Sequence, residues 1–175
     1  MSIARIALLV AALLTACQSA PEKSALATGD MALPIEIRQM LDRYEQMGLT
    51  LAADSTTGIV EACQSIIGAA NKLVTTSANA VEKAAVMAVA PAAQGLMQSV
   101  QSRDLPMVRA QFAALSQAMA TLAQGYPAIH HEHILVQCPM VTDGYNRWIQ
   151  RQGKIRNPYK GREMLDCGSP QDWDK

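Results

Sequence analysis

Apolar side chains recur at intervals of three and four residues along most of the chain, and this helical periodicity constrains the fold more than any other feature. It runs through four stretches, roughly 34–53, 59–74, 78–101 and 105–124, with short connections between them. Aromatic residues make up only 4% of the chain, so Ala, Met, Leu and Val must fill the core. Such a core favours close-packed helices over a sandwich or barrel. The sequence therefore predicts an all-α fold, an up-down-up-down four-helix bundle over 34–127.

Local signals agree with these boundaries. Pro34 precedes the first stretch, Asp54-Ser55-Thr56 offers N-cap chemistry for the second, and Asp104 does so for the fourth. Pro91 is expected to kink the third helix or to mark a boundary in it. The positions expected to face the core are Ile37, Met40, Leu41, Tyr44, Met47 and Leu51; Ile59, Val60, Cys63, Ile66, Ile67, Ala70, Leu73 and Val74; Val81, Ala84, Ala85, Ala88, Ala92, Leu96 and Val100; and Val108, Phe112, Leu115, Met119 and Leu122.

The character of the chain changes after Pro127. Residues 128–175 hold all three histidines, both tryptophans and four of the ten glycines, and the helical periodicity ends. A segment this rich in such residues is not typical of a disordered end. We expect an irregular, Cys-containing tail that belongs to the same domain and packs on the bundle.

The first residues carry the pattern of a bacterial export signal. Arg5 precedes an apolar run that is too short to span a membrane, and Leu14-Thr15-Ala16-Cys17 resembles the lipobox of bacterial lipoproteins. The resemblance implies a signal peptide over 1–16 and acylation of Cys17. Residues 17–33 lack periodicity and are expected to form a flexible tether. An ordinary secretory signal with a chance cysteine is the alternative.

The residues after Cys17 bear on the destination. Gln18 and Ser19 follow it with no Asp, which, by resemblance to sorting in Gram-negative bacteria, implies an outer-membrane lipoprotein that faces the periplasm. The whole chain has fifteen basic and fifteen acidic residues and no long run of either sign. This balance argues against a nucleic-acid partner, which requires a basic face to neutralise phosphates.

Three cysteines remain once Cys17 is set aside, and they allow two interpretations. In an oxidising compartment, Cys138 and Cys167 can form a disulfide, which leaves Cys63 as a buried thiol on a helix face. Alternatively, the tail binds a soft metal ion, because thiolate and thioether sulfur prefer Cu(I) and Ag(I). The candidate ligands are Cys138, Met140, Met164 and Cys167, with His131 and His133 as possible additions.

Three motifs in the tail carry a resemblance to a known family. They are Cys138-Pro139-Met140, Asn157-Pro158-Tyr159-x-Gly161 and Met164-Leu165-x-Cys167-Gly168. In this order they resemble the signature of a domain family of unknown function. That family occurs alone in secreted bacterial proteins and at the C-terminus of periplasmic adaptor subunits of copper and silver efflux pumps. The resemblance covers about 35–170, and it implies metal handling in the periplasm more than a mechanism.

The function predicted from the sequence is therefore the binding or buffering of copper or silver by a lipid-anchored protein. The membrane is the partner implied by the anchor, and a metal-efflux pump or another envelope protein is a further candidate. The alternative is a structural or interaction lipoprotein with a Cys138–Cys167 disulfide and no metal. An enzyme is not expected: a Cys138–histidine pair could act as a nucleophile, but no pattern for an oxyanion hole accompanies it.

Overall fold

The computed structural model describes residues 33–77 and 79–173. The expected signal peptide over 1–16, the acylation site Cys17 and the tether up to residue 32 lie outside the described residues. The described chain is mostly helical, as the periodicity predicts, and it ends in a small sheet.

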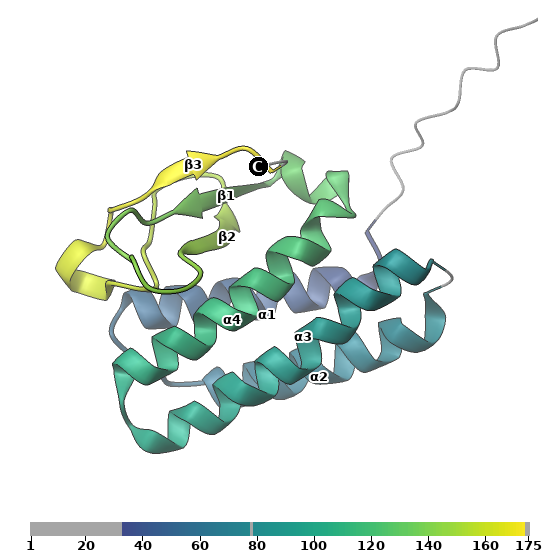
Figure 1. The fold of residues 1–175 in the computed structure, drawn as a ribbon, viewed down its shortest axis with the longest axis horizontal. Coiled ribbons are helices and arrows are strands. Elements are labelled where there is room, and N and C mark those ends of the chain that lie inside the picture. The colour runs from purple at the N-terminus through teal and green to yellow at the C-terminus, as the bar shows by residue number, and fades with distance from the viewer. Residues whose placement is uncertain (1–32, 78, 174–175) are drawn as a thin grey trace, which may run out of the picture.

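Four long helices form the larger part of the fold. Consecutive helices run in opposite directions, and each packs against the next (Figure 1). None of them, among the described residues, is long and apolar enough to cross a bilayer. The helices are α1 (Ile35–Ala52), α2 (Ile59–Thr76), α3 (Ala80–Ser99) and α4 (Leu105–Gln124), with short 3-10 turns at η1 (Val100–Ser102), η2 (Pro127–His131) and η3 (Gly161–Met164).

The N-caps predicted from the sequence are confirmed in part. Asp104 does occupy the N-cap position of α4, although its side chain makes no capping hydrogen bond. The expected cap of α2 is wrong: Gly58, at φ 79°, holds that position. Asp54 instead adopts a left-handed conformation at φ 60° and pairs with Arg109 of α4. Asn79, which the sequence did not single out, caps α3 by accepting from the Val81 amide at 2.8 Å.

The buried face of α3 is also different from the one expected. Val86, Val89, Ala93 and Leu96 are fully buried, whereas Val81 is 79% exposed. The helix carries alanines on several faces, so the pattern alone does not define one stripe. Val and Leu bury more apolar surface than Ala, and the helix turns them inward. The faces of α1 and α4 that were predicted to be buried are buried.

The tail corrects the prediction of a purely all-α fold with an irregular end. It forms a three-stranded antiparallel sheet in the order β2-β1-β3. The strands are β1 (His133–Gln137), β2 (Arg147–Arg151) and β3 (Ser169–Gln171). Strands this short show too few alternating positions to stand out from the surrounding Pro and Gly. The sheet lies over α1 and α4, with β2 against both helices (Figure 1).

An aromatic cluster joins the sheet to the bundle. Tyr44 of α1 and Phe112 of α4 stack at 5.2 Å between ring centroids. Tyr159 of the tail meets Phe112 at 6.0 Å and Trp148 of β2 at 5.8 Å. The hydroxyl of Tyr44 pairs with that of Ser116 at 2.7 Å. The few aromatic residues of the chain are therefore concentrated where the tail meets the helices.

Arg109 ties the tail to two helices. Its guanidinium donates to the Leu51 carbonyl at 2.9 Å, to Asp54 Oδ1 at 2.6 Å and to the Pro158 carbonyl at 3.0 Å. Gly161 lies directly beside this group at φ +57°, and a Cβ there would collide with Asp54 Oδ1 and Arg109 Nη2. Only a glycine lets the tail approach the Arg109–Asp54 pair this closely.

We expect Gly161→Ala to lower the free energy of unfolding by about 3 kcal/mol, because it adds both a strained positive φ and a steric clash. Chemical denaturation measures the effect. Gly58→Ala is the matched control: Gly58 also has a positive φ, 79°, but nothing lies within 4 Å of the added Cβ. That variant should lose only about 1 kcal/mol. Equal losses in the two variants would contradict the close packing of the tail on Arg109.

Candidate functional site

The structure brings Cys138 and Cys167 together. Cys138 follows β1 and Cys167 precedes β3, and these strands pair antiparallel with Gln137 opposite Ser169. Continued by one residue, this register places Cys138 opposite Gly168, so the two cysteines lie beside each other. Both are free thiols, with Cys138 fully buried and Cys167 partly exposed. The site is thus a dithiol with one sulfur reachable from the surface.

Asn157 organises the surroundings of this dithiol. Its Nδ2 donates to Cys138 Sγ at 3.2 Å and to the Cys167 carbonyl at 2.7 Å. Its Oδ1 accepts from the amides of Tyr159 at 2.9 Å and Lys160 at 3.1 Å. The side chain is completely buried, so each of these bonds replaces a contact with water. One residue therefore fixes both the thiol pair and the turn that follows it.

The electrostatics of the site favour the protonated form of Cys167. Burial raises the pKa of the Cys167 thiol, and the neighbouring Cys138 raises it further, while the charge of Lys160 acts in the opposite direction. Two thiolates side by side would repel each other. The Cys167 thiol is therefore held in its protonated form until a metal ion displaces the proton.

Each candidate methionine lies in the same hydrogen-bonded turn as one cysteine. The Val141 amide donates to the Cys138 carbonyl at 3.3 Å, which places Met140 in the turn after Cys138. The Cys167 amide donates to the Met164 carbonyl at 3.1 Å. Met140 is 49% exposed and Met164 is half-buried. Both thioethers are close to the thiols along the chain, but among the described residues no hydrogen bond joins them to the sulfurs.

The structure does not bring the candidate histidines to the sulfur ligands. His133 begins β1 and Cys138 follows its end, a separation of about 16 Å along an extended strand. His133 is buried, donates from Nδ1 to the Ile129 carbonyl at 3.2 Å, and its Nε2 is 3.7 Å from Glu45 Oε1. His131 is exposed on η2. The same separation keeps His133 from pairing with Cys138 in this conformation.

Cys63 is isolated from this site, as its place on a helix face predicts. It lies fully buried in the bundle and donates to Met47 Sδ at 3.7 Å. Burial raises the pKa of its thiol to about 12. Within residues 33–77 and 79–173, no three His, Cys, Asp or Glu side chains are grouped to hold a metal ion. Among the described residues, no third His, Cys, Asp or Glu side chain therefore joins the two thiols as a metal ligand.

The sequence analysis gave no role at the site to two residues that shape it, Asn157 and Arg109. Asn157 stands directly before Pro158, a context in which an Asn side chain often bonds to the backbone two residues on. That local signal indicates a turn at Asn157, but it does not indicate the bond to Cys138. Arg109 falls on a predicted helix with no local sign of its partners, which come from residues 51–54 and 158.

Comparison of the sequence with family models, with curated proteins and with solved structures finds no match. The geometry of the described residues is therefore the basis for a functional proposal.

Asn157→Asp should lower the free energy of unfolding by about 3 kcal/mol, because it removes the Nδ2 donor and buries a carboxyl beside a sulfur and a carbonyl. Burial raises the pKa of the introduced carboxyl above its unfolded value. The variant should thus be least impaired at about pH 5 and lose stability as the pH rises to about 8. Urea titrations of the variant and the unaltered protein at both pH values measure this. A loss that is independent of pH would contradict the buried position of the Asn157 side chain.

Proposed function

We propose that the protein is a periplasm-facing outer-membrane lipoprotein whose Cys138 and Cys167 bind one Cu(I) or Ag(I) ion. The observation that supports this most is the pairing of two free thiols, one of them reachable from the surface. Thiolate sulfur prefers these soft monovalent ions. No catalytic role and no nucleic-acid partner are part of the proposal.

Binding replaces two protons with one metal ion. Each thiol releases its proton to water as its sulfur bonds to the ion, so affinity should rise with pH. Asn157 Nδ2 remains available as a donor to the Cys138 sulfur, and a hydrogen bond of this kind stabilises a bound thiolate. Met140 or Met164 would supply a neutral third ligand by turning its side chain toward the pair, whereas the histidines are too distant.

The proposed location and partners rest on sequence resemblances. A lipid on Cys17 would hold the domain at the membrane, and the three tail motifs resemble a family found in copper and silver efflux adaptors. In this context the protein would buffer the metal ion or pass it to a pump in the same envelope. A protein partner of that kind is proposed on this resemblance alone.

The same adjacency of thiols supports a second candidate, a structural lipoprotein with a Cys138–Cys167 disulfide and no metal. The bond would close a loop of about 30 residues and contribute about 3–4 kcal/mol in the chain-entropy model. An oxidised pair has no thiolate to offer, so the two functions exclude each other at any one time.

Competition with a Cu(I) chelator under anaerobic conditions tests the metal proposal. We expect Cys167→Ser and Cys138→Ser each to weaken Cu(I) binding by more than about a hundredfold. Loss of a residue that only hydrogen-bonds to a metal ligand costs about 10- to 100-fold, so a larger loss indicates a direct ligand. Met140→Leu should cost about tenfold or less, because a thioether is neutral. Cys167→Ser is the more informative variant, since its partly exposed site tolerates a hydroxyl better than the buried site of Cys138.

Cys63→Ala is the matched control, because it removes a thiol from the bundle and leaves the pair intact. It should bind Cu(I) like the unaltered protein. If the double variant Cys138→Ser, Cys167→Ser competes as well as the unaltered protein, the metal proposal is wrong. If protein taken from the periplasm has one free thiol and no metal, the structural disulfide is the better description.

Cys17→Ser tests the proposed anchor. Since the acyl chains are proposed as the attachment to the membrane, this variant should move from the membrane fraction to the soluble periplasmic fraction. Fractionation with immunodetection measures the distribution, and Cys63→Ala again serves as the control for loss of a cysteine. A Cys17→Ser protein that stays with the membranes would place the attachment elsewhere.

A further inference from the structure

Lys160 stands in the turn that holds the dithiol, and its place there is fixed through the backbone. Its amide donates to Asn157 Oδ1 at 3.1 Å, while Nδ2 of the same asparagine donates to Cys138 Sγ. The next residue, Gly161, donates its amide to the Asn157 carbonyl at 3.1 Å and lies directly beside Arg109. Because backbone amides make both of these bonds, the side chain of Lys160 is not needed to hold the turn together.

The ammonium group of Lys160 has no carboxylate partner among the described residues. Asp166, which stands directly before Cys167, already pairs with two other cations of the tail. They are Lys154 at 3.5 Å and Arg156 at 3.1 Å. The charge of Lys160 acts instead on the Cys167 thiol: burial and the neighbouring thiol raise the pKa of Cys167, and Lys160 lowers it. Lys160 is therefore a partly buried cation whose charge reaches the dithiol.

The charge of a metal complex at this site depends on the ion. In the binding step proposed above, both thiols release their protons to water, and the two thiolates bring two negative charges. A monovalent ion such as Cu(I) leaves the complex with one negative charge, whereas a divalent ion such as Zn(II) leaves it neutral. The free thiols are neutral as well. A neighbouring cation therefore stabilises the complex of a monovalent ion and has almost no effect on that of a divalent one.

We infer that Lys160 makes the dithiol select a monovalent soft ion, Cu(I) or Ag(I), over a divalent ion such as Zn(II). This inference rests on the metal binding proposed above and gives Lys160 a role in the choice of ion. Lys160 is not a ligand, because an ammonium group has only donors and no lone pair. Cys138 is fully buried, so water screens the charge of its thiolate less than it would at the surface.

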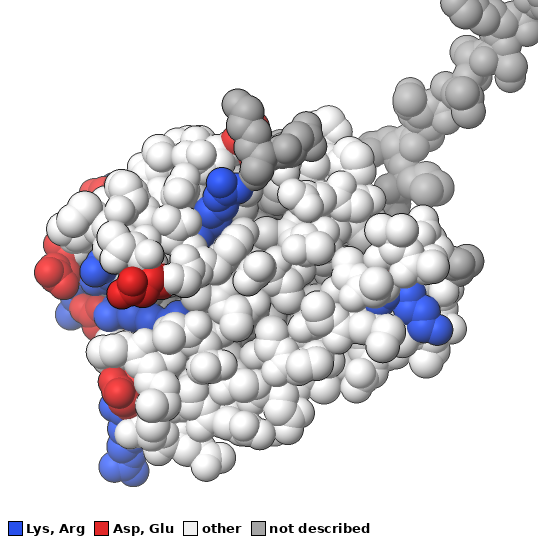
Figure 2. Space-filling view, in the orientation of Figure 1, with Lys and Arg blue, Asp and Glu red and all other residues white. Residues whose placement is uncertain are grey.

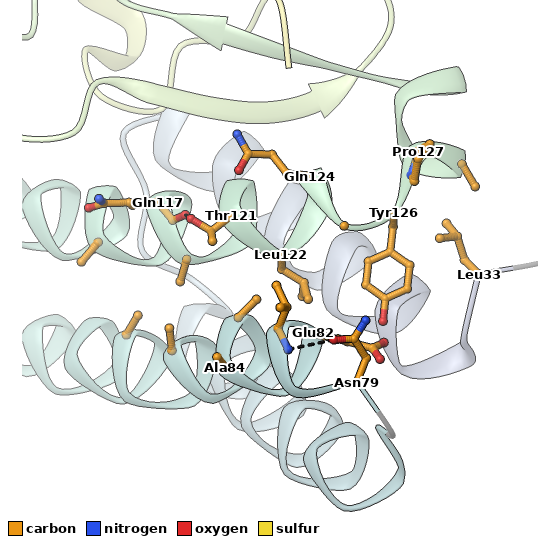
Figure 3. Close-up of a pocket in the computed structure, with 18 of the residues that line it drawn as sticks. Leu33, Asn79, Glu82, Ala84, Gln117, Thr121, Leu122, Gln124, Tyr126 and Pro127 are labelled. Atoms are coloured by element: carbon orange, nitrogen blue, oxygen red, sulfur yellow. Dashed lines mark hydrogen bonds between the residues drawn. The ribbon is translucent and has the colours of Figure 1, made fainter. Parts of the chain in front are cut away.

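The groove between α3 and α4 does not compete with this site for a soft ion. It has a volume of about 1720 Å³ and is lined by alanines from both helices, with Gln117, Leu122 and Tyr126 among its larger side chains (Figure 3). No cysteine, methionine, lysine or arginine is among its described lining residues. Figure 2 shows basic and acidic side chains together at the end of the molecule that carries η3, whereas the face over α3 and α4 is largely uncharged.

Lys160→Gln tests the inference, because it removes the charge and keeps the backbone amide that bonds to Asn157. In anaerobic competition with a Cu(I) chelator, this variant should bind Cu(I) about tenfold more weakly than the unaltered protein. In competition with a zinc chelator, the affinity for Zn(II), strong or weak, should be the same in both proteins to within about twofold. Lys160→Arg keeps the charge and should keep the Cu(I) affinity.

Lys83→Gln is the matched control, since it removes the same charge from an exposed position on α3. It should change neither affinity. Urea unfolding of the metal-free variants checks that each one is folded. Salt gives an independent result: the Debye length falls from about 10 Å at about 0.1 M salt to about 3 Å at about 1 M, so the Cu(I) difference between Lys160→Gln and the unaltered protein should shrink.

Three results would overturn the inference while the metal proposal stands. They are equal Cu(I) affinity in Lys160→Gln and the unaltered protein, an equal loss of Cu(I) and Zn(II) affinity in the variant, and a Cu(I) difference that salt does not change. The last two would assign the effect to packing, because a charge acts differently on the two complexes and is screened by salt. If the unaltered protein binds no Cu(I), the metal proposal is wrong and the inference is wrong with it.

Discussion

The guanidinium of Arg109 is the side chain that fixes the turn at 157–161 on the helices. It reaches the C-terminal turn of α1 through Leu51, the following loop through Asp54, and the tail through Pro158. Hydrogen bonds from a charged donor are worth more than neutral ones, and here one donor group serves three parts of the chain. It also holds the pKa of the Asp54 carboxyl below its usual value. Gly161 is required because nothing larger fits beside this group.

The proposed metal site follows from the same docking. Pro158 is fixed by Arg109, and the adjacent Asn157 bonds to Cys138 and to the backbone of Cys167. The turn from 157 to 161 thus connects the tail–bundle contact to the dithiol. A change that loosens the tail would also separate the thiols. Stability and thiol chemistry are therefore expected to change together in variants of this turn.

The helices are covered by the sheet on one side of the molecule and not on the other. On one side the sheet covers α1 and α4, and the aromatic cluster around Phe112 fills the space between them. On the other side α3 and α4 meet through alanines and leave a groove. The distance between two packed helices depends on the side chains at their contact, so small residues bring helices close only where no larger side chain lies between them. The valines of α3 point into the core, and the alanines are left to line the groove.

The sequence by itself determined the helices, because apolar spacing in α1 and α4 is a local property that the core then uses. It also identified the two tail cysteines as a pair. Tertiary structure alone decided three things. First, Val86 and Val89 of α3 are buried in place of the alanines. Second, the tail forms a sheet because strands distant in the sequence pair with each other. Third, the register of that sheet places Cys138 beside Cys167 and leaves His133 at the opposite end of β1. Each depends on contacts between residues far apart in the chain, which no local pattern encodes.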